Sequence, residues 1–255
     1  RCAAELHDNE VEQMMLAFLR RYPESVHVND VRFLLAMYYC EREEYDKARD
    51  YLNSVSYKAL TAEDKERYNM RMGYVEFTSG NLDKAYELFS TLSPMGNYVD
   101  HATYYKSYMA YARGELSVAR RGFESLRESR IYADLMPFYV MQIDFKGGDY
   151  RAVVASGDEL MQRTTPEQTL QINRMMAESW FQLQDYQAAV KYLRAYRSAG
   201  GVMGRVENYI MGYSLYRQAL YAEALPHLRE ACGKDDQLTQ NASYHLADCY
   251  LRAGD

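Results

Sequence analysis

The chain has 255 residues, 48% of them hydrophobic, and its 30 Lys and Arg against 36 Asp and Glu give a formal net charge of −6. Acidic and basic residues are interleaved rather than gathered into a basic stripe, which argues against a nucleic-acid-binding surface. No apolar run reaches the ~20 residues that cross a bilayer, so we expect no membrane-spanning segment.

The first predicted element is an amphipathic helix over residues 9–21, which ends at Tyr22-Pro23. We predict that it is the second helix of an incomplete helical hairpin, a half repeat spanning residues 1–28. Helices are then predicted over residues 30–41 and 45–55, followed by a longer linker over residues 56–64. Together these form the first complete predicted repeat, residues 29–64.

The clearest repeat follows at residues 65–98. Met72, Gly73 and Phe77 recur at helical spacing before the turn at residues 79–81, and a second amphipathic run then carries Ala85 and Phe89 on one face. Small side chains at Gly73 and Ala85 allow two helices to approach closely. One such hairpin cannot bury its own apolar face, so it needs copies of itself.

The copies are present at spacings of 34 to 37 residues. Aligned on the second helix, the small residue recurs as Ala48, Ala85, Ala119, Val153, Ala189 and Ala224, with Val11 as an earlier member. On the first helix it recurs as Ala36, Gly73, Ser107, Ala177, Gly212 and Ala247, with Met141 as the exception. Further repeats are therefore predicted at residues 99–132, 133–164, 165–202 and 203–238, with a final half repeat at 239–255. Pro226 lies inside a predicted second helix, where we expect a local bend.

With this period and this helix–turn–helix unit, the chain resembles the tetratricopeptide-repeat superfamily over nearly its whole length. The resemblance implies an all-α fold, a right-handed superhelix of helical hairpins forming a single solenoid over residues 1–255. Gly254-Asp255 resembles the inter-helix turn of a further hairpin, so we expect the chain to be a fragment of a longer array.

The sequence contains no catalytic, cofactor-binding or metal-binding constellation that we recognise. Phosphate-loop, nucleophile-elbow and zinc-helix motifs are missing, which predicts a non-enzyme without a cofactor. His245 and Cys249 are four residues apart on one predicted helix, but two ligands without a third are better explained by packing. Cys2, Cys40, Cys232 and Cys249 show no paired spacing and read as reduced, buried thiols.

The predicted functional feature is a binding surface. In tetratricopeptide superhelices the first helices line the concave side, and projecting the register places an aromatic groove there. The predicted partner-binding residues are Tyr74, Tyr104, Tyr108, Phe138, Gln142, Arg174, Glu178, Tyr209, Tyr213 and Tyr244. Family members that grip a C-terminal carboxylate carry Lys, Asn and Arg at such positions, so the aromatics here put a carboxylate clamp in doubt.

The 26 tyrosines admit a second interpretation. Rings at the ends of the first helices can pack between neighbouring repeats instead of facing a partner. The residues for which both interpretations stay open are Phe77, Tyr111, Phe145, Phe181 and Tyr216.

The sequence therefore predicts a non-catalytic scaffold that binds another protein or a peptide segment, with no nucleic acid as partner. The alternatives are a docking or regulatory arm of a larger enzyme and a self-associating structural repeat. The phrase at residues 19–25, LRRYPES, and the tyrosine content are similar to tetratricopeptide proteins of the bacterial cell envelope. That resemblance implies a periplasmic or envelope location and a role in envelope assembly, with the cytoplasm as the alternative.

Overall fold

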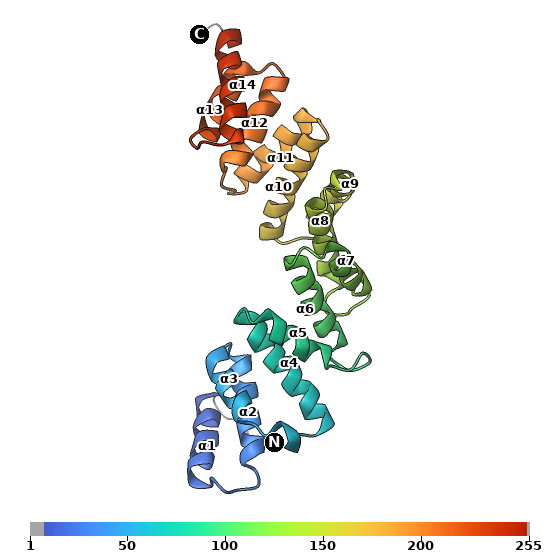
Figure 1. The fold of residues 1–255 in the computed structure, drawn as a ribbon, viewed down its shortest axis with the longest axis vertical. Coiled ribbons are helices and arrows are strands. Elements are labelled where there is room, and N and C mark those ends of the chain that lie inside the picture. The colour runs from blue at the N-terminus through green and yellow to red at the C-terminus, as the bar shows by residue number, and fades with distance from the viewer. Residues whose placement is uncertain (1–7, 254–255) are drawn as a thin grey trace. The chain divides into compact units, whose positions relative to one another are not determined.

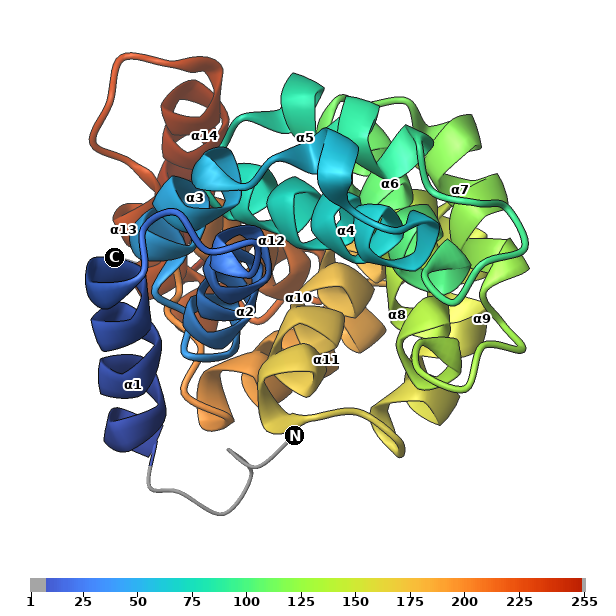
Figure 2. The same cartoon turned by 90° about the horizontal axis from the view of Figure 1, so that it is seen from below.

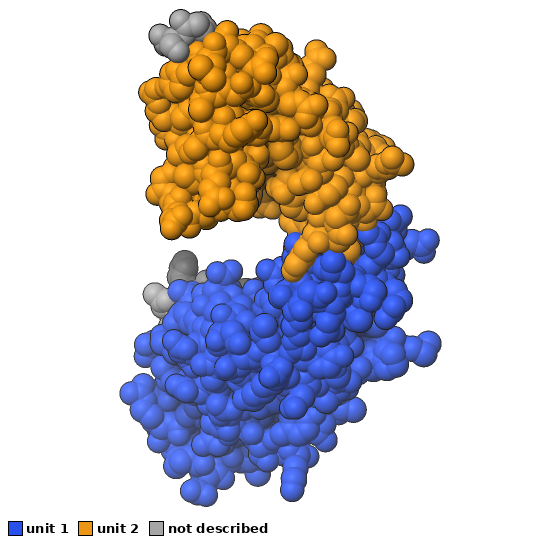
Figure 3. All heavy atoms as spheres, turned by 45° about the horizontal axis from the view of Figure 1, so that its top comes forward, with its two compact units in different colours: residues 1–132 blue, residues 133–255 orange. Residues whose placement is uncertain are grey.

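The structure, a computed structural model, describes residues 8–253. All regular elements in this range are α-helices or single 3₁₀ turns, and no strand occurs among the residues described. The chain divides into two compact units, unit 1 (residues 1–132) and unit 2 (residues 133–255), which Figure 3 colours separately. Each unit is described by itself.

Unit 1 contains three helical hairpins preceded by one helix. Its elements are α1 (Asp8–Arg21), α2 (Val28–Glu41), α3 (Tyr45–Ser54), the turn η2 (Tyr57–Ala59), α4 (Ala62–Thr78), α5 (Leu82–Ser90), α6 (Val99–Ala112) and α7 (Leu116–Ser125). Figure 1 shows α2 with α3, α4 with α5 and α6 with α7 as packed pairs. In Figure 2 the second helices α3, α5 and α7 lie on one side of the first helices α2, α4 and α6.

Unit 2 has the same plan, with three hairpins followed by one helix. Its elements are the turn η3 (Ala133–Leu135), α8 (Met136–Lys146), α9 (Tyr150–Met161), α10 (Pro166–Gln182), α11 (Tyr186–Ser198), α12 (Arg205–Arg217), α13 (Tyr221–Ala231) and α14 (Gln237–Ala253). Helix α13 continues through Pro226 to Ala231, so the proline does not break it. The predicted turn at Gly254-Asp255 lies outside the described residues, as does Cys2.

Each hairpin is held together by the small residue predicted on its second helix. Its six occurrences have no exposed surface at all: Ala48, Ala85, Ala119, Val153, Ala189 and Ala224. On the first helix, Gly73 meets Phe89 rather than Ala85, because a Cβ built at Gly73 would lie 2.7 Å from Phe89 Cε1. The small residues thus make room for the large side chains of the partner helix.

The six hairpin turns share one backbone conformation. In each, one residue after the first helix has φ between 57° and 81°: Glu43, Gly80, Gly114, Gly148, Gln184 and Ala219. The residue after it donates its backbone N–H to the carbonyl five positions earlier, as Asn81 does to Glu76 at 2.9 Å. This is the Schellman ending of a helix, in which glycine is favoured because it tolerates positive φ.

Aromatic rings at the ends of the first helices pack inside and between the repeats. Phe181 lies 6.1 Å from Tyr186 at the start of its own second helix and 5.7 Å from Tyr213 of the next repeat. Phe77 likewise contacts Tyr105 at 5.1 Å, and Tyr216 contacts His245 at 4.9 Å. For these three rings the packing interpretation is therefore the one observed.

Candidate functional site

Two adjoining hollows lie on a surface of unit 1 that is built largely from first helices. The first, about 480 Å³, lies between α1, α2 and α4 and is here called the apolar hollow. The second, about 370 Å³, lies between α2, α4 and α6 and is called the aromatic hollow. Glu41, Arg71 and Tyr98 line both, so the two hollows are neighbours that share these side chains. The surface that α2, α4 and α6 contribute to them is the first-helix face of unit 1.

Aliphatic and sulfur-containing side chains form the apolar hollow. They are Val11, Met14 and Met15 from α1 and Leu34 and Met37 from α2. Met14 is 58% exposed and Leu34 54% exposed, although both are large apolar side chains. Adjoining apolar side chains that stay open to water are typical of a surface that meets a partner.

Rings form the aromatic hollow. Tyr45 at the start of α3 packs edge-on against Tyr74 of α4 at 5.6 Å, and Tyr74 packs against Tyr105 of α6 at 5.5 Å. His101 closes the α6 side, where its Nδ1 lies 2.7 Å from the Tyr132 hydroxyl. Because each ring packs against another ring, the side chains that line this hollow are held in place.

Arg71 brings positive charge to the boundary of the two hollows. Burial raises the pKa of the Cys40 thiol on α2 to about 11, and Arg71 opposes that rise. Burial also lowers the pKa of His101 on α6; Asp100 raises it, and Arg71 lowers it further. The guanidinium therefore acts on side chains from both neighbouring first helices, and His101 is neutral at pH 7.

Of the predicted partner-binding residues in unit 1, only Tyr74 lines these hollows. Tyr104 stacks on Tyr132 with ring centroids 4.4 Å apart and 9° between the planes, so much of its surface is used inside the repeat. Tyr108 is exposed, and its ring packs edge-on against Phe77 at 5.6 Å.

In unit 2 the two predicted charged residues, Arg174 and Glu178, both lie on α10 and interact with Glu207 of α12. Arg174 donates to Glu207 Oε1 at 2.7 Å, and Glu207 is buried. Burial raises the pKa of the Glu178 carboxyl; Arg174 opposes that rise and Glu207 adds to it. These residues form a packed ion pair beside a half-buried carboxylate.

The predicted tyrosines of unit 2 form a second aromatic group. Tyr209 stacks on Tyr213 at 5.8 Å, and Tyr213 meets His245 of α14 at 4.7 Å. Arg217 donates to the Tyr213 hydroxyl at 3.1 Å and lies over the Tyr186 ring at 4.7 Å. These ring–ring and cation–ring contacts join α11, α12 and α14.

The remaining predicted residues of unit 2 differ widely in exposure. Phe138 is 6% exposed and belongs to the core of α8–α14, so it offers little surface to a partner. Gln142 donates its side-chain amide to Gln171 at 3.3 Å. Tyr244, 71% exposed on α14, has the most open ring of the predicted set.

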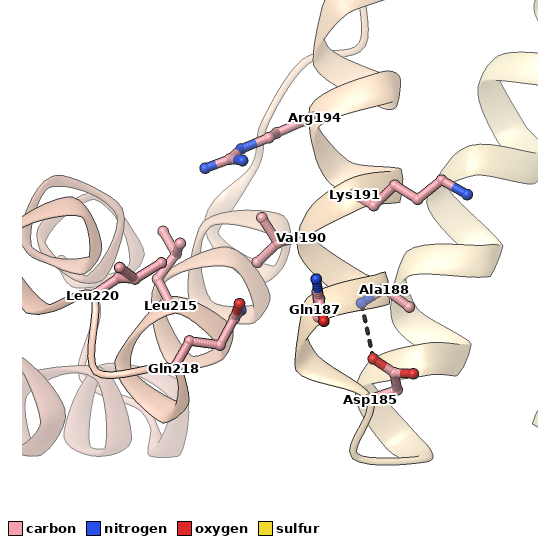
Figure 4. A pocket seen from close by; sticks show the side chains of 9 residues that line it. All are labelled: Asp185, Gln187, Ala188, Val190, Lys191, Arg194, Leu215, Gln218 and Leu220. Carbon is pink, nitrogen blue, oxygen red and sulfur yellow. Dashed lines mark hydrogen bonds between the residues drawn. The ribbon is translucent and has the colours of Figure 1, made fainter.

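A hollow of about 500 Å³ in unit 2, between α11 and the α12–α13 turn, is a weaker candidate (Figure 4). Lys191 and Arg194 point away from each other in Figure 4, and Arg194 is paired with Glu223 at 3.0 Å. Gln218 donates to the carbonyls of Tyr186 and Ser214. The polar side chains of this hollow already have partners or point away from one another. They therefore do not converge on a point where a ligand could bind.

Metal-ligand geometry is also missing from the residues described. Cys249 is fully buried in the core of unit 2, and no third His, Cys, Asp or Glu joins it and His245 in a group that could hold a metal ion. Cys40 and Cys232 are unpaired thiols. Within residues 8–253, no helix has the length and apolar character needed to span a bilayer.

Comparisons with known proteins agree on one architecture. The family model described as tetratricopeptide repeat matches residues 209–255. The crystal structure of the APC/C hetero-tetramer Cut9–Hcn1 is similar over 95% of this chain and 46% of that chain, with 13% identity and a TM-score of 0.56. This chain has the fold of tetratricopeptide-repeat proteins. The predicted all-α tetratricopeptide fold is thereby confirmed.

A second similar structure is a tetratricopeptide repeat protein from Parabacteroides merdae ATCC 43184. It has 12% identity, covers 94% of this chain and 92% of that chain, and gives a TM-score of 0.54. This chain thus spans about half the length of the Cut9–Hcn1 chain and nearly all of the bacterial one. At these identities the likeness shows the fold. No curated protein sequence matches the chain.

Sequence reasoning about these tetratricopeptide repeats missed Arg71 and the contribution of α1. Arg71 follows Met70 and lies three residues before Tyr74, so helical spacing already put it on the same face as a predicted residue. Val11 and Met14 were assigned to a second helix, where the register predicts burial against a first helix. Their exposure to a hollow depends on how α1 packs on α2, which periodicity does not specify.

Proposed function

We propose that this protein is a non-catalytic interaction scaffold, and that a segment of another polypeptide binds along the first-helix face of unit 1. Tetratricopeptide-repeat proteins are generally non-catalytic scaffolds, so the fold supports this class. The observation that carries the proposal is that the apolar and aromatic hollows lie side by side and share Glu41, Arg71 and Tyr98. Together they give a surface with exposed apolar side chains, fixed rings and one central cation.

The physical reason is that each hollow supplies a different part of peptide recognition. Burial of Met14 and Leu34 removes apolar surface from water at about 25 cal/mol per Å². The rings of Tyr74 and Tyr105 are already held in place, so contact with them costs little side-chain entropy. Unit 2 offers Tyr244 as a further exposed ring, 71% of which is open to solvent.

The test is to select peptides from a displayed random library against the whole chain. Hydrogen exchange then shows where the best peptides bind. We expect slower exchange in α1, α2, α4 and α6 on binding, with α5 and α7 unchanged. Failure to select any binder, or protection confined to the second helices, would contradict the proposal. Sedimentation of the free chain across concentration separates self-association from peptide binding.

We further propose a bacterial cell-envelope location, supported by the LRRYPES phrase at residues 19–25 and the tyrosine content. Fractionation of cells carrying a tagged full-length gene tests it. Recovery of the protein in the cytoplasmic fraction alone would overturn this part and leave the scaffold proposal intact.

A further inference from the structure

The chemistry of the bound segment can be narrowed from the charges that face it, given the proposed function. We infer that the first-helix face of unit 1 binds a polypeptide segment in which a single carboxylate lies next to aliphatic side chains. The carboxylate pairs with Arg71, and the aliphatic side chains enter the apolar hollow.

The position of Arg71 is the first step. It lines both hollows, and no ion pair or hydrogen bond joins it to any residue that the structure describes. Three other basic side chains of unit 1, by contrast, pair with carboxylates: Lys84 with Glu76, Arg113 with Asp83, and Lys47 with Glu44. A guanidinium without an anion, set between two hollows, is therefore available to a carboxylate that enters from outside.

Arg67 provides the contrast that makes the assignment specific. It lies one turn before Arg71 on α4 and lines the same apolar hollow. Unlike Arg71, it is near two carboxylates of its own helix, Glu63 at 3.9 Å and Asp64 at 3.8 Å. A ligand carboxylate gains more from Arg71, because there it displaces no existing partner.

The acidic side chains nearby limit the ligand to one carboxylate. Glu41 lines both hollows and Glu43 lines the aromatic one, so an acidic tract would meet like charges. His101 adds no positive charge at neutral pH, because burial lowers its pKa. A single ligand carboxylate can pair with the Arg71 guanidinium, whereas a second one would be repelled by Glu41 and Glu43.

The apolar hollow defines what flanks the carboxylate. Three of its side chains are methionines, Met14, Met15 and Met37, which adapt to aliphatic groups of different shapes. Its volume of about 480 Å³ exceeds the needs of one aliphatic side chain. A segment with Leu, Ile or Met beside Asp or Glu fits both features.

A polypeptide suits this surface better than a fatty acid. An alkyl carboxylate could fill the apolar hollow and reach Arg71, but it would leave the aromatic hollow empty. Tyr45, Tyr74 and Tyr98 line that second hollow. The Tyr45 hydroxyl donates to the Tyr74 hydroxyl at 3.5 Å, and a phenol oxygen can still accept a hydrogen bond from a backbone N–H. The occupant of both hollows is therefore a chain with polar groups along its length.

The experiment uses the best selected peptide, with its affinity for the whole chain measured at low and high salt. We expect an Asp or Glu at a fixed place beside aliphatic residues, and weaker binding as salt rises. Arg71→Gln should weaken binding about tenfold or more, the range of a charge-assisted hydrogen bond. Arg67→Gln is the matched control and should change it less than about threefold.

A peptide-side substitution keeps the test independent of the variant's folding. Replacing the peptide carboxylate by its amide should reproduce the loss in the native protein, with no further loss when Arg71→Gln is added. Leu34→Ser, at an exposed position, should weaken binding without lowering the thermal midpoint.

The outcomes separate the two proposals. Peptides that protect α1, α2, α4 and α6 but lack an acid, or bind Arg71→Gln as tightly as the native chain, would overturn this inference and leave the scaffold proposal standing. Selection of no peptide would overturn both. Binding of decanoate that depends on Arg71, with no peptide selected, would show that an alkyl carboxylate is the ligand and overturn the polypeptide assignment.

Discussion

Gly73 shows how a single side chain sets the geometry of a hairpin. A Cβ at this position would lie 2.7 Å from Cε1 of Phe89, which is completely buried and cannot move away freely. The same relation recurs in unit 2, where a Cβ at Gly212 would lie 2.8 Å from Leu228 Cγ. The closeness of the helices in these two hairpins therefore depends on residues without side chains.

We predict that Gly73→Ala destabilises the protein by about 1–3 kcal/mol, because overpacking exceeds the gain in helix propensity. Chemical denaturation measures the change. The double variant Gly73→Ala with Phe89→Leu should recover part of the loss, since leucine vacates the space of the ring edge. Equal stability of the native chain and Gly73→Ala would show that Phe89 relaxes.

Glu76 is a buried carboxylate that ties α4 to α5. It accepts hydrogen bonds from Lys84 Nζ at 2.6 Å and from the Asn81 side chain at 2.7 Å, and Arg49 Nε lies 3.8 Å away. Burial by itself raises the pKa of Glu76, but the bonds from Lys84 and Asn81 outweigh it and leave the pKa below its ordinary value. Glu76 therefore stabilises the fold above its unfolded-state pKa, and this contribution is lost as the pH falls through the folded value.

We predict that Lys84→Met destabilises the protein by about 2–3 kcal/mol at pH 7, since it leaves a buried charge with fewer partners. The loss should shrink at acid pH, where Glu76 is protonated. Lys234→Met, at an exposed lysine, is the control and should change little. A loss for Lys84→Met that does not depend on pH would contradict this account.

Glu178 has the opposite pH dependence. Burial raises its pKa, so the folded state disfavours its charged form. The destabilisation is absent below the unfolded-state pKa, begins as the pH rises through it, and is complete above the folded-state pKa. Glu178→Gln should therefore raise the thermal midpoint at pH 7 and leave it unchanged near pH 3.5. Glu230→Gln, at an exposed site, should leave it unchanged at both pH values.

At the scale of elements, the six hairpin turns share a conformation but not a residue type. Three have glycine at the left-handed position, and Glu43, Gln184 and Ala219 occupy it in the others at φ of 60°, 65° and 57°. A side chain at positive φ costs roughly 1–2 kcal/mol. These three turns are consequently held by the packing of the helices on either side.

We predict that Ala219→Gly stabilises the protein by about 0.5–1 kcal/mol, because relief of the strained φ exceeds the entropy that glycine adds to the unfolded chain. Ala195→Gly, the same change in the exposed middle of α11, should destabilise by a similar amount. Thermal denaturation of both measures the contrast. A loss of stability in Ala219→Gly would show that the turn is not strained.

At the scale of the whole molecule, each unit has apolar clusters of its own. In unit 1 one cluster joins α2, α3 and α4 around Leu35 and Leu52, and another joins α4, α5 and α6 around Phe89 and Met109. In unit 2 one cluster extends from Phe138 of α8 to Cys249 of α14. Repeats contact chiefly their neighbours, so such clusters can form without distant parts of the chain.

We therefore predict that residues 1–132 and 133–255, produced separately, are each helical and unfold cooperatively. Circular dichroism during heating measures both properties. A fragment that stays unfolded would show that its clusters need residues from the other part. If fragment 1–132 folds, it should also bind the selected peptide as the whole chain does.

Periodicity was sufficient to predict the tetratricopeptide fold. A small residue that recurs every 34 to 37 positions within a helix–turn–helix unit is typical of stacked helical hairpins. Periodicity was less informative about the site. Tyr74 and Tyr108 occupy equivalent places on their helices, yet Tyr74 lines a hollow and Tyr108 packs edge-on against Phe77 outside it. Register states which face of a helix a ring occupies, whereas its exposure depends on neighbours far away in the sequence. Arg71 gains its importance in the same way, since only the packing of α1, α2, α4 and α6 leaves it between two hollows without an anion.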